Sequence, residues 1–543
     1  MVKNMNYPYE NLTIHTLPKL LQRSVTLYPQ HKALGKVSQE VFNYASFHSQ
    51  VLEMVSLLRK NGISQGDKVL LLSENMPQWA IAYFSVTYFG AIIVPILPDF
   101  HPEDVHRIIE HSEVKAIFVS QKHLSTIKQY KGDIEFVIEL NSLELLQELS
   151  KPTPMLKIEK TIPQPNEQDP ASLIYTSGTT GNSKGVLLSH KNLVTNAMSA
   201  YIQVTIKPDD IFLSLLPLAH TFESTVGLIV PILHGSSVYY IDKPPTPSVL
   251  LKALKIVRPT MIISVPLIIE KIYKNKVLPQ FSKSFFIRNL YKIPFIRKQL
   301  NNIAGKKLLE TFGGRLRFFG IGGAGISPFV EQFLIEAKFP FIVGYGLTET
   351  APLLAGSILG KKIKYRSTGV AMAGVELKIR NRDPQTGKGE IIAKSPSVML
   401  GYYKDEEKTD EVMKDGWFLT GDLGYIDDEG YLFISGRSKN VIIGSGGENI
   451  YPEQIEAIIN QNKFVLDALI IEKDSKLIAK INLNYELLEE TITEKKKEEL
   501  LEEIRKDINA QISSFSRMVK FIEEKEPFIK TPTKKIKRYL YTE

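Results

Sequence analysis

Cysteine is missing from the sequence altogether. Its absence excludes disulfide frameworks, thiolate metal sites and cysteine nucleophiles, so any thiol chemistry must use an external thiol. Large low-complexity blocks are also missing, and a hydrophobic content of 43% with 23% charged residues is typical of a globular protein. A chain of 543 residues is too long for one ordinary core, which predicts two to four domains.

The sequence also lacks the marks of export and of membrane insertion. Residues 1–10 have no apolar core of the kind that signal peptides carry, which favours a cytoplasmic protein. Residues 75–98 carry no charge and are long enough to span a bilayer, but a glycine and two prolines interrupt their second half. We expect a buried helix over 80–89 and a buried strand over 91–96 instead.

Positive charge is concentrated in one segment. The net charge of +8 is mild for this length, and residues 270–310 alone carry ten Lys and Arg against two acids. Within them, residues 281–298 mix aromatic and cationic side chains, a pattern typical of segments on a membrane surface. The segment predicts either a helix pair with a solvated basic face or peripheral attachment to anionic lipid. Nucleic acid is not an expected partner, because no recognisable binding module accompanies the charge.

Helical and strand-like segments alternate from residue 15 to about residue 150, which predicts a parallel sheet covered by helices on both faces. Beyond residue 355 short strands separated by Gly, Asp and Pro predict a small antiparallel subdomain. The fold class is therefore α/β. We expect a large domain of mixed and parallel sheets over residues 1–439, with the antiparallel subdomain over about 355–439, and a small α+β domain over 440–543. The expected strands cover residues 68–73, 91–96, 116–119, 136–138, 172–175, 186–188, 211–216, 261–265, 318–321, 340–343, 389–393, 423–426, 431–435 and 468–472, and the expected helices 51–61, 79–89, 192–202 and 494–512.

A loop rich in hydroxyls and glycine lies between two apolar strands, over Thr176–Gly185. Its glycines let the backbone approach an anion, its hydroxyls offer donors, and Lys184 supplies a point charge. The loop does not fit a Walker A motif, because Gly178 and Gly181 are only three residues apart and a strand follows. By itself the loop indicates polyphosphate binding, and a hairpin without a ligand stays open as the alternative.

Two further glycine turns follow expected strands, Gly322–Gly325 and Gly344–Thr350. In open α/β sheets, ligands gather beyond the carboxyl ends of the strands, where these turns would lie. The turns therefore predict a second part of the same binding site.

Five motifs occur in a fixed order and carry a resemblance to a known family. The sequence resembles the adenylate-forming superfamily of acyl-CoA synthetases, peptide-synthetase adenylation domains and luciferases, from about residue 15 to residue 540. The motifs are Thr176-Ser-Gly-Thr-Thr-Gly181 with Lys184, Tyr345-Gly-Leu-Thr-Glu349, Thr420-Gly-Asp422, Gly436-Arg437-Ser-Lys439 and Thr531-Pro-Thr-Lys-Lys-Ile-Lys-Arg538.

The resemblance implies a reaction in two steps. A carboxylate attacks the α-phosphate of ATP, with Mg²⁺, to give an acyl-adenylate and pyrophosphate. A thiol, usually that of coenzyme A, then displaces AMP to leave a thioester. The protein positions the reactants and neutralises charge without a nucleophile of its own, which agrees with the absence of cysteine.

The resemblance also implies the residues that bind the phosphates and the metal. Thr348 would donate to the α-phosphate, and Glu349 with the hydroxyl of Thr176 would lie at Mg²⁺, which favours oxygen ligands. By itself, Glu349 could equally be a carboxylate favoured by a helix N-terminus. The residues implied around the β- and γ-phosphates are Thr176, Ser177, Gly178, Thr179, Thr180, Gly181 and Lys184.

The nucleoside would be held by a separate group of residues. Gly323-Ala324 and Tyr345-Gly346 would flank the adenine, with the tyrosine ring stacked on it. Asp422 would accept both ribose hydroxyls and Arg437 would assist, although Asp422 alone could be a simple turn residue.

Lys535 matches the lysine that bridges the substrate carboxylate and the α-phosphate in this family. The usual pattern has glycine just before this lysine, whereas Lys534 stands there in this chain. Lys534 and Lys537 are therefore alternatives, but Thr533 and the following residues favour Lys535. A basic tail in solvent is the other interpretation.

In this family a small, mobile C-terminal domain rotates between the two steps. Lys439 and Asn440 occupy the hinge position, and asparagine tolerates unusual backbone angles. The stretch that follows, with Gly446 and Gly447, resembles the loop that lines the thiol channel.

The turns Leu216–Glu223 and Ser264–Tyr273 look most like those of long-chain fatty acyl-CoA synthetases. His220 is expected at the mouth of the acyl pocket, and a structural histidine that caps a strand is the alternative. The expected function is ATP-dependent synthesis of acyl-CoA from a fatty acid. The expected small-molecule partners are therefore a fatty acid, ATP with Mg²⁺, and coenzyme A.

Two other functions are weighed. One is a fatty acyl-AMP ligase or adenylation enzyme that loads the thiol of a separate carrier protein. The other is a non-catalytic nucleotide-binding homologue, which is disfavoured because Thr176, Lys184, Glu349, Asp422 and Lys535 are all present. The sequence leaves open the acyl chain length, homodimer formation and peripheral membrane contact of an otherwise cytoplasmic protein.

Overall fold

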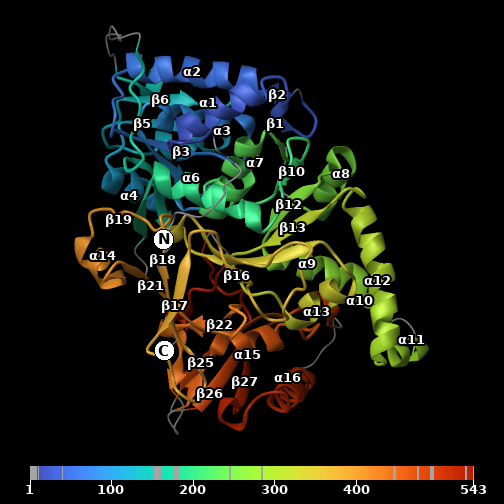
Figure 1. The fold of residues 1–543 in the computed structure, drawn as a ribbon. Helices are drawn as coiled ribbons and strands as arrows, with labels where there is room; N and C mark the ends of the chain where they lie inside the picture. The colour runs from blue at the N-terminus through green and yellow to red at the C-terminus, as the bar shows by residue number, and fades with distance from the viewer. Residues whose placement is uncertain are drawn as a thin grey trace.

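Two large sheets form the framework of the protein (Figure 1). The structure is a computed structural model, and it describes residues 9, 11–39, 41–151, 161–176, 183–241, 243, 246–282, 285–443, 448–473, 476–488, 494–531 and 535–541.

The first sheet has eight strands in the order β19-β9-β8-β4-β3-β5-β6-β7. Its central strands pair in parallel, and β8 and β9 form the antiparallel hairpin that flanks the predicted phosphate loop. Short apolar runs without helical periodicity form these strands because both faces of the sheet are covered. The strands are β3 (Lys68–Leu72), β4 (Ile92–Ile96), β5 (Ala116–Val119), β6 (Phe136–Glu139), β7 (Glu144–Leu145), β8 (Pro170–Thr176), β9 (Lys184–Ser189) and β19 (Gly401–Tyr402).

The second sheet has nine strands in the order β16-β15-β14-β13-β12-β10-β11-β1-β2. The strands from β10 to β14 pair in parallel, so their carboxyl ends meet at one edge. The strands are β1 (Lys32–Lys36), β2 (Val41–Asn43), β10 (Ile211–Ser214), β11 (Ser237–Tyr240), β12 (Met261–Ser264), β13 (Phe318–Ile321), β14 (Phe341–Gly346), β15 (Leu353–Gly356) and β16 (Val370–Ala371).

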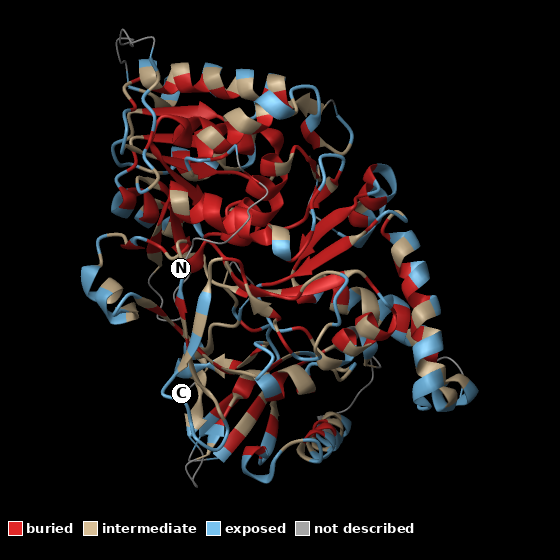
Figure 2. Cartoon of the chain, in the orientation of Figure 1, coloured by how far each residue is buried: buried red, intermediate tan, exposed pale blue. Residues whose placement is uncertain are grey.

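A layer of helices lies between the two sheets and forms the largest core. Alternate residues of a strand point to opposite faces, so Val69 and Leu71 of β3 join this core while Leu70 and Leu72 pack on the outer face. Trp79 is fully buried in the central layer, and the helices and strands of the interior are coloured as buried in Figure 2. The central helices are α1 (Leu17–Leu27), α2 (Tyr44–Lys60), α3 (Pro77–Tyr88), α6 (His190–Ser199) and α7 (Val230–His234).

Outer helices complete the packing on each side. Helix α4 (Pro102–Ser112) covers the first sheet, and α8 (Pro247–Val257), α12 (Pro294–Thr311) and α13 (Pro328–Glu336) cover the second. The predicted α/β class with parallel and mixed sheets is confirmed, and every expected strand overlaps an observed one.

Three details differ from the sequence-based expectations. The helix expected over 51–61 begins at Tyr44, because the Asn43 side chain caps it by accepting from the Ser46 amide at 2.7 Å. Lys32–Lys36 pairs with β11, a contact between segments far apart in sequence. Residues Glu223–Ile229 form a π-helix, which the apolar pattern did not distinguish from other buried structure.

The uncharged stretch over 75–98 forms helix α3 and strand β4, as predicted. Both elements are buried, which explains why they carry no charge. None of the described helices is both long and apolar enough to cross a membrane.

The last third of the chain forms smaller sheets. Five antiparallel strands, β17 (Glu376–Arg380), β18 (Gly389–Lys394), β20 (Met413–Lys414), β21 (Trp417–Ile426) and β22 (Leu432–Arg437), make the expected small sheet. Strands β25 (Val465–Lys473), β26 (Lys476–Leu483) and β27 (Lys520–Glu523) pack with α15 (Pro452–Ile459) and α16 (Glu494–Asn509) around a separate core. The division of the chain at residues 439 and 440 stays a prediction.

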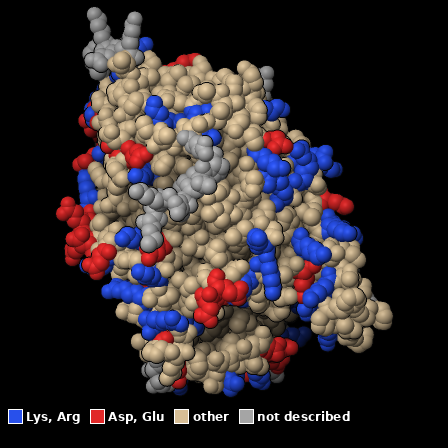
Figure 3. All heavy atoms as spheres, in the orientation of Figure 1, with Lys and Arg blue, Asp and Glu red and all other residues tan. Residues whose placement is uncertain are grey.

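A helical arm projects from the side of the second sheet (Figure 1). It consists of α11 (Phe285–Leu290) and α12, and Phe285, Phe286 and Phe295 are 73%, 70% and 71% exposed. Figure 3 shows Lys and Arg side chains along this side of the molecule and an uncharged tip at the end of the arm. The predicted mixture of aromatic and basic residues is thus a surface feature.

One buried ion pair ties together the amino ends of three parallel strands. Asp210, directly before β10, accepts from Arg317 Nε at 2.8 Å and from Thr260 Oγ1 at 2.7 Å. Burial alone would raise the pKa of Asp210, but hydrogen bonds from Arg317, Thr260 and Lys207 lower it overall. The carboxylate is therefore charged at neutral pH and needs its partner.

Replacing Arg317 by Met should lower the free energy of unfolding by about 3–5 kcal/mol, because Asp210 would keep a buried charge without its partner. Urea denaturation measures the change. Arg315→Met, at an exposed position on the same segment, is the matched control and should stay within about 0.5 kcal/mol. Equal effects of the two substitutions would show that the ion pair does not stabilise the sheet.

Candidate functional site

The candidate site lies at the carboxyl ends of β13 and β14. Gly323 follows β13 with a φ of 83°, and it lies exposed beside Ala324. At Gly346, the last residue of β14, a Cβ atom would lie only 1.7 Å from the carbonyl oxygen of Pro352. Glycine is therefore required there by the close approach of two backbone segments. The next residues form a single 3₁₀ turn, Thr348–Thr350, which holds Glu349 at the sheet edge.

Asp422 and Arg437 face each other on neighbouring strands. They are paired across β21 and β22, and Arg437 Nε lies 2.9 Å from Asp422 Oδ1. The hydroxyl of Tyr345 donates to Asp422 Oδ2 at 2.7 Å. Burial and the charge of Asp422 raise the pKa of Tyr345, so this hydroxyl stays protonated. The structure thus brings together three of the predicted nucleoside-binding residues.

A second cluster links the other sheet to Glu349. The hydroxyl of Tyr402 on β19 donates to Glu349 Oε1 at 2.9 Å, and Lys184 Nζ lies 5.0 Å from the centre of the Tyr402 ring. Burial lowers the pKa of Lys184, and Lys408 and Lys439 lower it further. Tyr402 was not predicted, and no sequence signal singled it out, because its role depends on β19 pairing with β9.

Lys535 lies among the charged groups of both clusters. The surrounding protein displaces water from the Lys535 amine, which lowers its pKa most, and the charge of Arg437 lowers the pKa further. The charges of Asp422 and Glu349 raise the pKa. Its side chain nevertheless keeps access to solvent. The Thr531 amide donates to the Lys535 carbonyl at 2.7 Å and so holds the backbone at Lys535. The alternative Lys534 lies outside the described residues, as does Thr533.

His220 lies in the turn between β10 and the π-helix. Its Nδ1 accepts from the amide of Phe222 at 3.2 Å, which leaves Nε2 to carry the proton of the neutral ring. Burial and then the charge of Lys535 lower the pKa of His220 to about 4. The ring is therefore neutral at pH 7 and close to Lys535.

Glu223, three residues further on, is completely buried. The hydroxyl of Ser214 donates to its Oε1 at 2.5 Å, and its Oε2 has no partner among the described residues. Burial raises the pKa of this carboxyl to about 8, so it is protonated at neutral pH. Glu223 ends a turn that resembles those of the family. The sequence did not show that this residue is buried, and burial decides whether its carboxyl group is charged.

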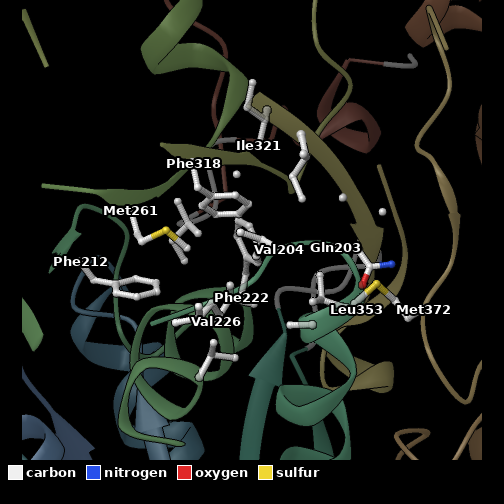
Figure 4. A pocket seen from close by; sticks show the side chains of 18 of the residues that line it. Gln203, Val204, Phe212, Phe222, Val226, Met261, Phe318, Ile321, Leu353 and Met372 are labelled. Carbon is white, nitrogen blue, oxygen red and sulfur yellow. The ribbon is translucent and has the colours of Figure 1, made fainter. Parts of the chain in front are cut away.

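An apolar pocket opens in the second sheet beside this turn (Figure 4). Phe222 and Val226 line it from the π-helix, and Met261, Phe318 and Ile321 line it from β12 and β13. The empty space between the lining atoms, gaps and open solvent included, amounts to about 520 Å³. Phe222 lines the pocket and follows His220 by two residues, and the expected position of His220 at a pocket mouth stays a prediction.

The residues present fit a site for Mg²⁺ bound together with a nucleotide. They do not surround a metal ion with protein ligands alone. No group of three potential His, Asp or Glu ligands occurs within the described part of the chain. Glu349 is a carboxylate at the sheet edge, and Thr176 ends β8 with its hydroxyl 3.5 Å from the carbonyl of Lys184. Mg²⁺ usually needs only one or two carboxylates when phosphates and water supply the other ligands.

Several predicted residues fall outside the described part of the chain. In the phosphate loop these are Ser177, Gly178, Thr179, Thr180 and Gly181, and in the loop expected to line the thiol channel they are Gly446 and Gly447. Lys439 and Asn440 are described, and the Asn440 side chain donates to Glu453 Oε1. The roles of all these residues stay predictions.

Comparison with known proteins identifies the family of the chain. The profile described as AMP-binding enzyme matches residues 21–403, which is well over half of the chain. The chain therefore belongs to the AMP-binding enzyme family, and the resemblance noted in the sequence is confirmed.

Named relatives are similar over most of their length. The peroxisomal long chain acyl-CoA synthetase 7 of Arabidopsis thaliana is 29% identical over 497 residues, which cover 84% of this chain and 70% of the relative. The long-chain-fatty-acid–CoA ligase FadD15 of Mycobacterium tuberculosis is 27% identical over 441 residues, covering 76% and 72%.

Solved structures share the fold. The anthranilate CoA ligase AuaEII, in complex with anthranoyl-AMP, has a TM-score of 0.79 at 21% identity, with 97% of this chain and 96% of that chain covered. ATP-bound MatB from Rhodopseudomonas palustris has a TM-score of 0.76 at 22% identity, covering 97% and 98%.

Glu223→Gln should change the pH dependence of stability. The folded carboxyl keeps its proton up to about pH 8, whereas the unfolded one loses it near pH 4.5. The folded state binds the extra proton between these values, so the free energy of unfolding of the native sequence falls as pH rises through this window. Glutamine resembles the protonated carboxyl but does not titrate, so the fall should shrink by an amount on the order of a few kcal/mol.

Urea denaturation of both proteins across this pH window measures the difference. Glu144→Gln, at an exposed position, serves as the control and should leave the pH dependence unchanged. Parallel curves for the native and Glu223→Gln proteins would contradict the assigned protonation.

Proposed function

We propose that this protein activates a fatty acid with ATP and Mg²⁺ to an acyl-adenylate, and then transfers the acyl group to coenzyme A. The observation that carries the proposal is the position of Lys535. It lies close to Glu349, Asp422, Arg437 and His220, beside an apolar pocket.

The first step joins two anions. An oxygen of the fatty carboxylate attacks the α-phosphorus of ATP, and the bond from that phosphorus to the bridging oxygen breaks to release pyrophosphate. Lys535 would lie between the carboxylate and the α-phosphate and offset their repulsion. Mg²⁺, when bound with the nucleotide, would neutralise part of the phosphate charge near Glu349 and Thr176. Lys184 would contact the leaving pyrophosphate.

The nucleoside would be held by groups that are already in place. Asp422 uses one position on each oxygen for Tyr345 and Arg437, and a carboxylate offers about four acceptor positions in all. Two positions therefore remain for the ribose hydroxyls. The Tyr345 ring, fixed through its hydroxyl, would present a face to the adenine.

The second step requires a thiol to reach the acyl carbon. The thiolate sulfur attacks that carbon, and the bond to the phosphate oxygen breaks to release AMP. Lys535 would block part of this approach, so the proposal includes a rotation about Lys439 and Asn440 that removes it. A carrier-protein thiol could replace coenzyme A by the same chemistry, and the acceptor is decided by assay.

Lys535→Ala should reduce fatty-acid-dependent pyrophosphate release by about 10²- to 10³-fold, because a preorganised charge at the reacting centre is lost. Thioester formation from supplied acyl-adenylate should be nearly unchanged. Lys537→Ala, two residues away, is the matched control and should leave both reactions intact. Equal loss of both steps in Lys535→Ala would contradict the role assigned to this lysine.

The same assay, with straight-chain acids from acetic to eicosanoic acid, tests the substrate class. Formation of acyl-CoA with the longer acids supports the proposal. Pyrophosphate release that never leads to acyl-CoA would instead indicate an enzyme that loads another thiol.

We also propose that the helical arm contacts an anionic membrane surface. Phe285, Phe286 and Phe295 are exposed together, and Arg288 lies 5.4 Å from the centre of the Phe285 ring. Aromatic side chains next to cations suit the boundary between headgroups and acyl chains. Arg297 is not part of this surface, because it binds the buried carboxylate of Glu336 at 2.8 Å. The contact would let the enzyme take fatty acid directly from lipid.

Changing Arg288, Lys292 and Lys298 to Gln should weaken binding to anionic vesicles by about 3 kcal/mol, since each cation contributes about 1 kcal/mol. Co-sedimentation with vesicles of phosphatidylserine measures the loss. A matched triple variant at exposed Lys60, Lys122 and Lys131 should bind as the native protein does. Unchanged binding of the arm variant would remove this proposal.

A further inference from the structure

Gln203 is the one polar side chain among the described residues that line the apolar pocket. It is 3% exposed and follows helix α6 and a short 3₁₀ turn. Figure 4 shows the Gln203 side chain at the edge of the pocket beside Leu353 and Met372, on the side opposite Phe212 and Met261.

The carboxamide has no hydrogen-bond partner among the described residues. Both its Oε1 and its Nε2 are buried and unpaired. The backbone is satisfied, since the Gln203 carbonyl accepts from the Leu359 amide at 2.8 Å. Leaving a buried amide unpaired is unfavourable, and native proteins almost always pair such groups with protein, water or ligand. The unpaired ends of Gln203 therefore point to an occupant of the pocket.

The Gln203 side chain forms part of the pocket wall, away from the adenylation edge. A Cβ atom at Gly356 would lie 3.1 Å from Gln203 Cγ, so the side chain passes close to the end of β15. Gly356 pairs with Gly344, whereas Leu353 at the start of β15 pairs with Gly346. Because β14 ends at Gly346 beside the candidate nucleotide site, Gln203 lies behind that edge. A group that meets Gln203 would therefore belong to the acyl chain and not to its carboxylate.

The chemistry of the carboxamide limits what that group can be. An amide offers a donor and an acceptor, so it matches a hydroxyl or a carbonyl oxygen. A charged end group is disfavoured, because the other lining side chains are apolar and no cation compensates a buried charge there. A plain methylene chain would leave both ends of the amide unpaired.

We propose that the pocket selects fatty acids that carry a neutral hydroxyl or oxo group along the chain, with Gln203 as the specificity-determining residue. This inference rests on the proposed function and names its substrate class. The hydrogen bond to Gln203 replaces the one that the substrate oxygen loses on leaving water. An unsubstituted chain would leave the Gln203 amide without a hydrogen-bond partner. The cost of that unpaired amide would make the pocket prefer the substituted acid over the unsubstituted one.

The test compares hexadecanoic acid with its hydroxy and oxo derivatives, substituted at successive carbons, as substrates for pyrophosphate release. The best derivative should exceed the parent acid by about tenfold or more in kcat/KM. Gln203→Met keeps the side-chain length without its polar atoms. It should lower kcat/KM for that derivative and raise it for the parent acid, so that the ratio falls by about tenfold or more.

Gln147→Met, the same substitution at an exposed position outside the pocket, is the control and should leave the ratio unchanged. Equal use of the parent acid and all derivatives would overturn the inference and leave the proposed function standing. A ratio that Gln203→Met does not alter would also overturn it and would indicate a bound water as the partner. Absence of pyrophosphate release with every acid would instead refute the proposed function itself, and the inference with it.

Discussion

Repulsion between anions is the constraint on which the candidate site depends. A carboxylate must approach a triphosphate, and neither can do so unless fixed positive charge lies between them. In the proposed reaction this charge would come from three segments that are far apart in sequence, through Lys184 on β9, Arg437 on β22 and Lys535 near the C-terminus. Acids placed among these cations, above all Asp422 and Glu349, keep them from repelling one another.

The fold explains how such distant residues meet. Parallel strands of the second sheet end together, the β8–β9 hairpin of the first sheet places Lys184 beside β19, and the antiparallel β21–β22 pair aligns Asp422 with Arg437. The buried parts of these strands are apolar and carry few polar side chains. Several of the candidate residues, such as Lys184, Glu349 and Arg437, therefore lie at or just beyond strand ends, where the backbone can turn and side chains can reach a substrate.

Sequence reasoning predicted what depends on local pattern and missed what depends on distant packing. The short apolar strands and the glycine turns were visible because backbone geometry demands particular residues, as at Gly346. The motifs carried the nucleotide-binding residues by resemblance, and their roles stay predictions. Tyr402, Glu223 and Gln203 could not be found in this way. Each of these residues matters because it is buried or because it contacts a residue on another element. Neither property can be read from the neighbouring residues in the sequence.

The position of Arg437 has a mechanical consequence for the proposed rotation. Arg437 is the last residue of β22 and is anchored to Asp422, while the pivot at Lys439 and Asn440 begins only two residues later. In the proposed rotation, the anchored strand would stay in place and the segment that carries Lys535 would move. The nucleoside clamp would therefore stay assembled throughout the turn. The AMP part of the acyl-adenylate would stay bound while the acyl group is exposed to its acceptor. The intermediate could therefore pass from the first reaction to the second without leaving the protein.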